Sequence, residues 1–171
     1  MLMAFWEVQR LTREINALER QAIETRTRLS NYQKYASVLG GSSILTMGNI
    51  AGMSAELLPR ASMFAQFSNQ ASSMSAMQNL QAMKFRGMVP YTGNPVSQYQ
   101  IEMSAFARFK EESMKALKQQ EIQVLNEKEK EIQLEMNGIE QRIKMKRAML
   151  DSVKQLAAEE ARDSAPKFGL G

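Results

Sequence analysis

The stretch from residue 4 to residue 39, AFWEVQRLTREINALERQAIETRTRLSNYQKYASVL, decides the fold class. Its apolar side chains recur at alternating intervals of four and three residues, the heptad pattern of a helix that packs along a second helix. This N-terminal seam consists of Ala4, Val8, Leu11, Ile15, Leu18, Ala22, Thr25, Leu29, Tyr32, Ala36 and Leu39. Because only Thr25 is polar, the pattern predicts a coiled-coil helix over residues 1–39, ended by Gly40-Gly41.

A second, longer helix is predicted over residues 94–164. Asn94 is a good N-cap and Pro95 suits the first helical position, whereas Pro166 cannot continue a helix. Gly138 interrupts this stretch and marks either a close contact or a bend. The second half carries another heptad, the C-terminal seam: Ile132, Met136, Ile139, Ile143, Lys146, Leu150, Val153 and Ala157.

Charge divides the chain into two charged ends and a charge-poor middle. Residues 1–35 carry ten charged side chains, residues 36–106 carry five, and residues 107–171 carry 25. We expect one or two short helices in the Gly/Met-rich middle, residues 40–93, and a flexible tail over residues 165–171. Methionine adapts well to irregular contacts, so the middle is predicted to form an interface. Its candidate residues are Met47, Met53, Met63, Phe64, Phe67, Met74 and Met77.

Composition argues against most chemistry. The chain has no cysteine and no histidine, which excludes thiolate nucleophiles, Cys-based metal sites and the commonest general base. Its carboxylates are interpreted as solvated helix faces, and its glycines lie in no phosphate-binding pattern. The net charge of +4 is spread over alternating signs rather than a basic stripe. We therefore expect no enzyme, metal, cofactor or small-molecule substrate, and no nucleic-acid partner.

Together these patterns predict an all-α protein, a long antiparallel helical hairpin with coiled-coil character and a shorter helical middle segment. The first helix covers only about half of the second, and the charge-poor middle would expose a large apolar surface in a monomer. We therefore expect a homo-oligomer, a structural protomer that self-assembles through helix–helix contacts. The assembly is a filament, a tube or a ring, according to its symmetry.

Two other functions stay open. Residues 36–55 carry no charge but hold many small polar residues, so membrane contact through residues 36–58 is the basis of a membrane-active ejection- or translocon-type protein. The apolar tip with Phe5 and Trp6 packs on a neighbour or touches a membrane. A cytoplasmic coiled-coil adaptor or chaperone is the other alternative. The N-terminus does not read as a cleavable signal peptide. An extracellular assembly is favoured, with virion and cytoplasm open.

The arrangement of two coiled-coil ends around a different middle resembles flagellin and the filament proteins of type III secretion. The resemblance rests on residues 4–39 and 94–164 and on the segment between them. It implies that the terminal helices pair and line a tube while the middle faces outward or joins subunits. The middle of such filaments is usually polar, and here it is apolar. That feature is closer to the internal virion proteins that tailed phages eject. Neither resemblance assigns a role to a single residue.

Overall fold

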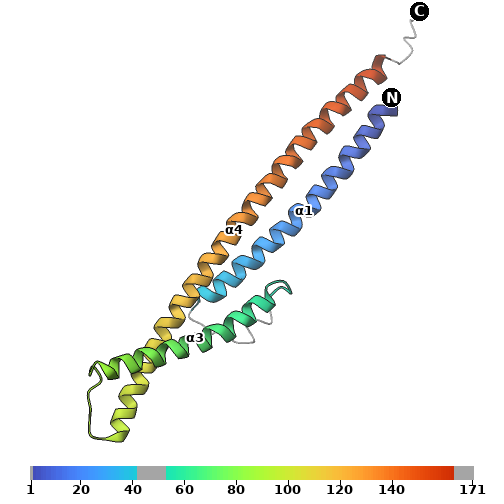
Figure 1. The fold of residues 1–171 in the computed structure, drawn as a ribbon. Helices are drawn as coiled ribbons and strands as arrows, with labels where there is room; N and C mark the ends of the chain where they lie inside the picture. The colour runs from blue at the N-terminus through green and yellow to red at the C-terminus, as the bar shows by residue number, and fades with distance from the viewer. Residues whose placement is uncertain (1, 42–52, 164–171) are drawn as a thin grey trace, which may run out of the picture. The chain divides into compact units, whose positions relative to one another are not determined.

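The computed structural model describes residues 2–41 and 53–163. Within these ranges the chain forms three α-helices and no strand: α1 (Leu2–Gly40), α3 (Leu58–Phe85) and α4 (Pro95–Asp163) (Figure 1). The all-α class predicted from the sequence is confirmed. At the start of α4, the side-chain oxygen of Asn94 accepts a hydrogen bond of 2.9 Å from the backbone N–H of Val96. Asn94 therefore caps this helix.

The chain divides into two compact units. Unit 1 combines residues 1–30 with residues 130–171, and unit 2 is the continuous stretch 31–129. Both long helices contribute to both units, because residue 30 lies within α1 and residue 130 lies within α4. The shorter helix, α3, belongs to unit 2 alone.

In unit 1, the first part of α1 and the last part of α4 lie side by side (Figure 1). Ion pairs join them: residues 14 and 19 of α1 meet residues 146 and 147 of α4, whereas residues 26 and 28 meet residues 140 and 135, so the two segments run antiparallel. The pairs are Glu14–Lys146 at 2.6 Å, Glu19–Arg147 at 2.6 Å, Arg26–Glu140 at 3.8 Å and Arg28–Glu135 at 3.5 Å. The most buried side chains of the unit are Leu11, Ile15, Thr25, Ile132, Ile139 and Ile143. A row of buried apolar residues is thus flanked by charges.

Unit 2 has a core to which three segments contribute. Its buried members are Tyr35 and Leu39 of α1, Leu57 and Ala61 at the start of α3, and Leu125 of α4. Half-buried apolar side chains from all three helices pack against this cluster. The core therefore includes the start of α3 as well as the two long helices.

Both ends of α3 follow from local sequence. Pro59 lies in its first turn, where a missing backbone N–H costs nothing. At the other end Gly87 has a φ of +68°. The N–H groups of Gly87 and Met88 donate to the carbonyls of Lys84 and Met83, each at 3.0 Å. This is the Schellman motif, which ends the helix and needs a residue that tolerates a positive φ.

Two opposite sides of α3 differ in the size of their residues. The inner face consists of Ala61, Ser68, Ser72 and Ala76, all at most 2% exposed. The hydroxyls of Ser68 and Ser72 donate hydrogen bonds to carbonyls of their own helix. The inner face therefore consists of small residues whose hydroxyl groups have hydrogen-bond partners. The opposite side, which we call the outer stripe, carries Met63, Phe67, Gln70, Met74, Met77, Gln81 and Phe85. At about 100° per residue, these seven fall within an arc of about 80°.

The close contact considered at Gly138 is not found. A Cβ atom at this residue would meet no described atom within 4 Å other than those of its chain neighbours and the adjacent backbone of its own helix. The glycine instead borders a groove of about 510 Å³ in unit 1, which Thr25 and Ile139 also line. The position faces open space, so a larger residue would fit there.

Candidate functional site

Three helices of unit 2 meet at one carboxylate, that of Glu121. Arg60 on α3 donates two hydrogen bonds to it, from Nε at 2.6 Å and from Nη2 at 3.1 Å. The hydroxyl of Tyr35 on α1 donates a third, at 3.3 Å. The side chain of Glu121 is 14% exposed and that of Arg60 is 34% exposed. We call these three residues the Glu121 node, because one acceptor on α4 holds a donor from each of the other helices.

The electrostatics of the Glu121 node favour a structural role. Burial and the neighbouring Glu121 carboxylate raise the pKa of Tyr35 above its usual value. The hydrogen bond that Arg60 donates to Glu121 raises the pKa of Arg60. At neutral pH the phenol is therefore protonated and the guanidinium is charged, which is the protonation state that donates to a carboxylate. Neither group is poised for proton transfer near pH 7.

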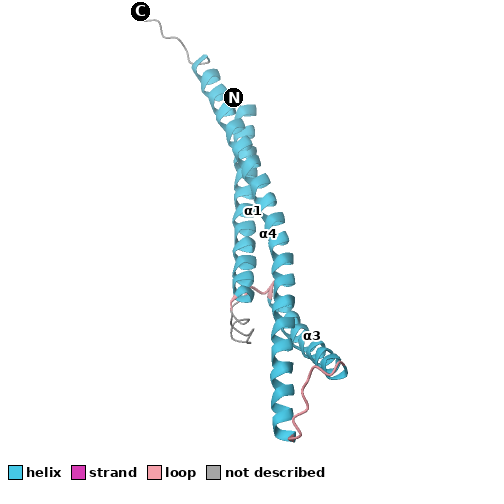
Figure 2. Ribbon diagram, turned by 90° about the vertical axis from the view of Figure 1, so that its left-hand side faces the viewer, coloured by secondary structure: helices cyan, strands magenta, loops and turns pink. Residues whose placement is uncertain are grey.

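A second ion pair joins the far end of α3 to α4. Lys84 pairs with Glu102, and the pKa of Glu102 is lowered, first by the hydrogen bond from Lys84 and then by the one from Gln98. Figure 2 shows α3 beside the first part of α4. Because Arg60 meets Glu121 and Lys84 meets Glu102, the two segments run antiparallel.

The few charged residues of the middle segment are evident from the sequence, but the ion pairs that they form between helices were not predicted. Three of the five charged residues in the stretch 36–106, namely Arg60, Lys84 and Glu102, form interhelical ion pairs. A signal was present: the few charges in an apolar segment need partners, since an unpaired buried charge is costly. The partner Glu121 could not be chosen among the many carboxylates of the long C-terminal helix.

The predicted assembly seams lie on the inward sides of the two units. None of their described members is exposed, and the residues concerned are Val8, Leu11, Ile15, Leu18, Leu29, Tyr32, Leu39, Ile132, Met136, Ile139, Ile143, Leu150 and Val153. In unit 1, Glu14 and Lys146 flank these residues, and the hydrogen bond from Lys146 lowers the pKa of Glu14. Within one copy of the chain, the seams are thus occupied by contacts between its own helices.

The seven residues of the predicted middle interface fall into three groups, which are undescribed, half-buried and exposed. Met47 lies outside the described residues. Met53 and Phe64 are half-buried and pack against the core of unit 2. The remaining four, all on the outer stripe, are exposed to between 56% and 69%: Met63, Phe67, Met74 and Met77.

The outer stripe is therefore the candidate functional surface of unit 2. Its members include Phe85, which is 95% exposed. No charged residue occurs between positions 61 and 83, so nothing on α3 repels an apolar partner there. Other large exposed apolar side chains follow in the sequence, at Met88, Tyr91, Val96 and Tyr99. A row of exposed apolar side chains along one face of a helix, such as the outer stripe, normally marks a contact surface, whereas scattered apolar residues need no partner.

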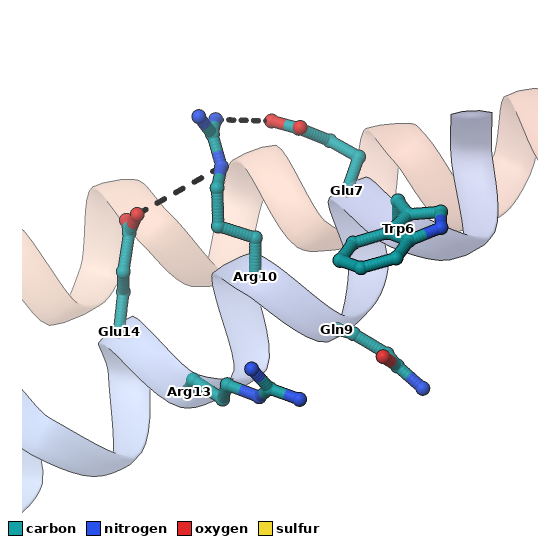
Figure 3. Close-up of a pocket in the computed structure, with 6 residues that line it drawn as sticks. All are labelled: Trp6, Glu7, Gln9, Arg10, Arg13 and Glu14. Atoms are coloured by element: carbon teal, nitrogen blue, oxygen red, sulfur yellow. Dashed lines mark hydrogen bonds and ion pairs between the residues drawn. The ribbon is translucent and has the colours of Figure 1, made fainter.

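The described residues also form two hollows that are open to solvent. A groove of about 720 Å³ in unit 2 has Leu39, Met114 and Ile122 among its lining residues, together with several lysines. One of these, Lys115, is paired with Glu111 at 2.8 Å. A smaller hollow of about 290 Å³ is lined only by residues of α1 between Trp6 and Glu14 (Figure 3). There Arg10 lies between Glu7 and Glu14, and Trp6 is 66% exposed.

Within residues 2–41 and 53–163, no three His, Cys, Asp or Glu side chains are grouped so that they could hold a metal ion. None of the helices in these ranges combines the length and the apolar character that a membrane span requires. The segment 36–58, predicted as a membrane contact, falls partly outside these ranges.

Comparison with known proteins adds no relative. No protein-family model, curated protein or solved structure matches the chain.

Proposed function

We propose that this chain is a structural protomer that associates with further copies of itself through helix–helix contacts. The observation that carries the proposal is the outer stripe of α3, a row of large apolar side chains that covers nothing in the described part of its own chain. Each of its methionines and phenylalanines exposes more than half of its surface. Covering roughly 100 Å² on one such side chain would contribute about 2.5 kcal/mol, so four or five of them supply substantial binding energy.

A second exposed row supports assembly beyond a single contact. Leu134, Met145 and Leu156 of α4 are each more than half exposed and follow one another at intervals of 11 residues. Eleven residues make about three helical turns, so the three side chains lie on one face of unit 1. A protomer with two separate apolar surfaces can bind two neighbours, which is the requirement for a filament, tube or ring.

We also propose that the paired segments of unit 1 form a two-stranded antiparallel coiled coil, the hairpin expected from the sequence. The buried heptad residues and the four ion pairs that flank them support this assignment. In this role the seams stiffen each protomer, and the exposed rows join protomers. The work of the protein is mechanical, and the proposal includes no catalytic step.

Light scattering coupled to gel filtration tests the proposal. Across a concentration series from nanomolar to hundreds of micromolar, the average mass should rise above the 19.4 kDa of one chain. Negative-stain microscopy then separates filaments and rings from small oligomers. A constant monomer mass throughout the series would overturn the proposal. An oligomer of fixed size that forms no polymer would favour the adaptor alternative. Assembly that appears only with liposomes would favour the membrane-active one.

A further inference from the structure

We infer that the outer stripe of α3 binds the same stripe of a second copy, antiparallel, across a two-fold axis. This inference rests on the proposed self-assembly. It names the surface at which two copies first associate and the register in which their helices pair. The stripe has the spacing of a pairing helix: its members follow one another at intervals of 4, 3, 4, 3, 4 and 4 residues. That is a heptad seam which, unlike the seams of unit 1, has no partner in the described part of the chain.

The stripe faces away from the rest of unit 2. The inner face, with Ala61 and Ser72 among its members, is directed about 180° away from it around the helix. In Figure 2, α3 has α4 along one side and no described segment along the opposite side. A second helix can therefore approach the stripe without displacing the contacts of the inner face.

Composition points to a second copy as the occupant. An acidic or basic partner would need charges opposite its own, and the stripe has none between positions 61 and 83. Instead it carries two glutamines, Gln70 and Gln81, among large apolar residues. A glutamine side chain both donates and accepts hydrogen bonds, so its natural partner in an otherwise apolar contact is another amide. The stripe provides that partner itself.

The glutamines also select the register. If Gln70 of one copy lies opposite Gln81 of the other, the two-fold axis passes between residues 75 and 76. Met74 then lies opposite Met77 of the second copy, and the symmetry repeats both contacts. Two glutamine pairs would thus flank a centre of four methionines. A polar residue at one seam position commonly fixes register in this way, since any slip leaves it facing apolar side chains.

Charge favours the antiparallel orientation over the parallel one. In a parallel pair the two copies of Lys84 would lie side by side, as would the two positive ends of the helix dipoles. In the antiparallel register Lys84 lies opposite Phe67, and the dipoles oppose one another. Covering five large side chains buries roughly 500 Å² per copy and roughly 1,000 Å² in total, near the lower limit for a specific interface. We therefore expect a dimer that dissociates on dilution to the nanomolar range.

Two glutamates on the stripe test the surface. Met74→Glu combined with Met77→Glu should raise the concentration of half-dissociation at least tenfold, because it places four carboxylates at the axis. Asn79→Glu is the matched control, since Asn79 is exposed on the same helix but lies about 160° from Met63. It should leave the association unchanged. Circular dichroism checks that both variants keep their helix content. Association that is unaffected by the double variant would overturn the inference while leaving self-assembly intact.

Cysteine cross-linking tests the register, and the chain is suited to it because it contains no cysteine. A disulfide needs Cα atoms within about 7 Å. The Gln70→Cys and Gln81→Cys variants should therefore cross-link when mixed with each other, but neither should cross-link with itself. In the antiparallel pair, two copies of residue 81 are separated by 11 residues, about 16 Å. Self-cross-linking of either single variant would indicate a parallel pair and overturn the inference. A wild-type monomer at all concentrations would overturn both this inference and the proposed function.

Discussion

Removing the carboxylate of Glu121 should destabilise unit 2 by about 3 kcal/mol. Glu121→Ala deletes the acceptor of three hydrogen bonds, of which the two from Arg60 are charge-assisted. Breaking a fully buried ion pair costs about 3–5 kcal/mol, because the remaining charge has no partner. Arg60 is 34% exposed and can turn partly toward water, so we place the loss at the lower end of that range. The Tyr35 hydroxyl also loses its partner and adds to the cost.

Urea unfolding followed by circular dichroism, at one fixed protein concentration, measures this loss. A change of about 3 kcal/mol also corresponds to a melting temperature lowered by about 6–12 °C for a chain of this size. Hydrogen exchange should speed up first in peptides around Tyr35 and Arg60. The matched control is Glu112→Ala, which removes the exposed pair with Arg108 at 3.1 Å. That variant should lose at most about 0.5 kcal/mol, since exposed pairs contribute little.

A double variant separates the stability contributed by the Arg60–Glu121 ion pair from the stability contributed by each residue alone. The single variants Arg60→Met and Glu121→Leu are compared with the double variant, which removes the cation as well as the carboxylate. Its stability should return most of the way to that of the wild type, with a coupling energy of about 1–3 kcal/mol. The reasoning is refuted if Glu121→Ala lies within 0.5 kcal/mol of the wild type, on the order of a surface change. It is equally refuted if the two single losses simply add.

Three further changes test other parts of the structure. Gly138→Ala should raise the free energy of unfolding by about 0.5–1 kcal/mol, because the position is helical and open, and a loss in urea unfolding would contradict the open space there. Ile139→Ala should cost about 2–5 kcal/mol, whereas Leu134→Ala on the exposed face of the same helix should cost at most about 0.5 kcal/mol; equal losses would refute the assigned faces. Since Lys146 lowers the pKa of Glu14 in the folded state, the unfolded chain binds more protons in acid, so the pair stabilises the fold above pH 4.5 and is lost as pH falls below it. Melting curves from pH 7 to pH 3 should show a shallower acid loss for Lys146→Met, and an unchanged slope would count against the ion pair.

The sequence was most informative where one helix has one neighbour. In unit 1, the heptad alone identifies the inward residues of both segments, such as Leu11 and Ile139, because a two-helix contact buries one stripe on each helix. The caps are also local: Asn94 and Pro95 determine the start of α4 through their own backbone and side-chain chemistry. Both kinds of signal depend on residues only a few positions apart.

Unit 2 was less predictable because its helices have more than one neighbour. Tyr35 is off the N-terminal seam, yet it is fully buried, since α3 covers a second side of α1. On α3 the apolar pattern of Met63, Phe67 and Met74 marks the exposed side, while the buried side consists of small residues that carry little periodic signal. Size complementarity between helices is a property of the packed unit, so no window of sequence contains it.

The small inner face of α3 has a consequence for how this protein tolerates mutation. Residues such as Ala61 and Ser72 have no exposed surface, so each added methylene must displace a neighbouring helix. In a library of all single substitutions, the four inner-face residues of α3 should thus be the positions of this helix where folding fails most often. The phenylalanines and methionines of the outer stripe should accept most replacements in a monomeric folding screen and be selected only in a screen for association. A comparison of the two screens would show that one side of α3 is required for folding and the opposite side for association.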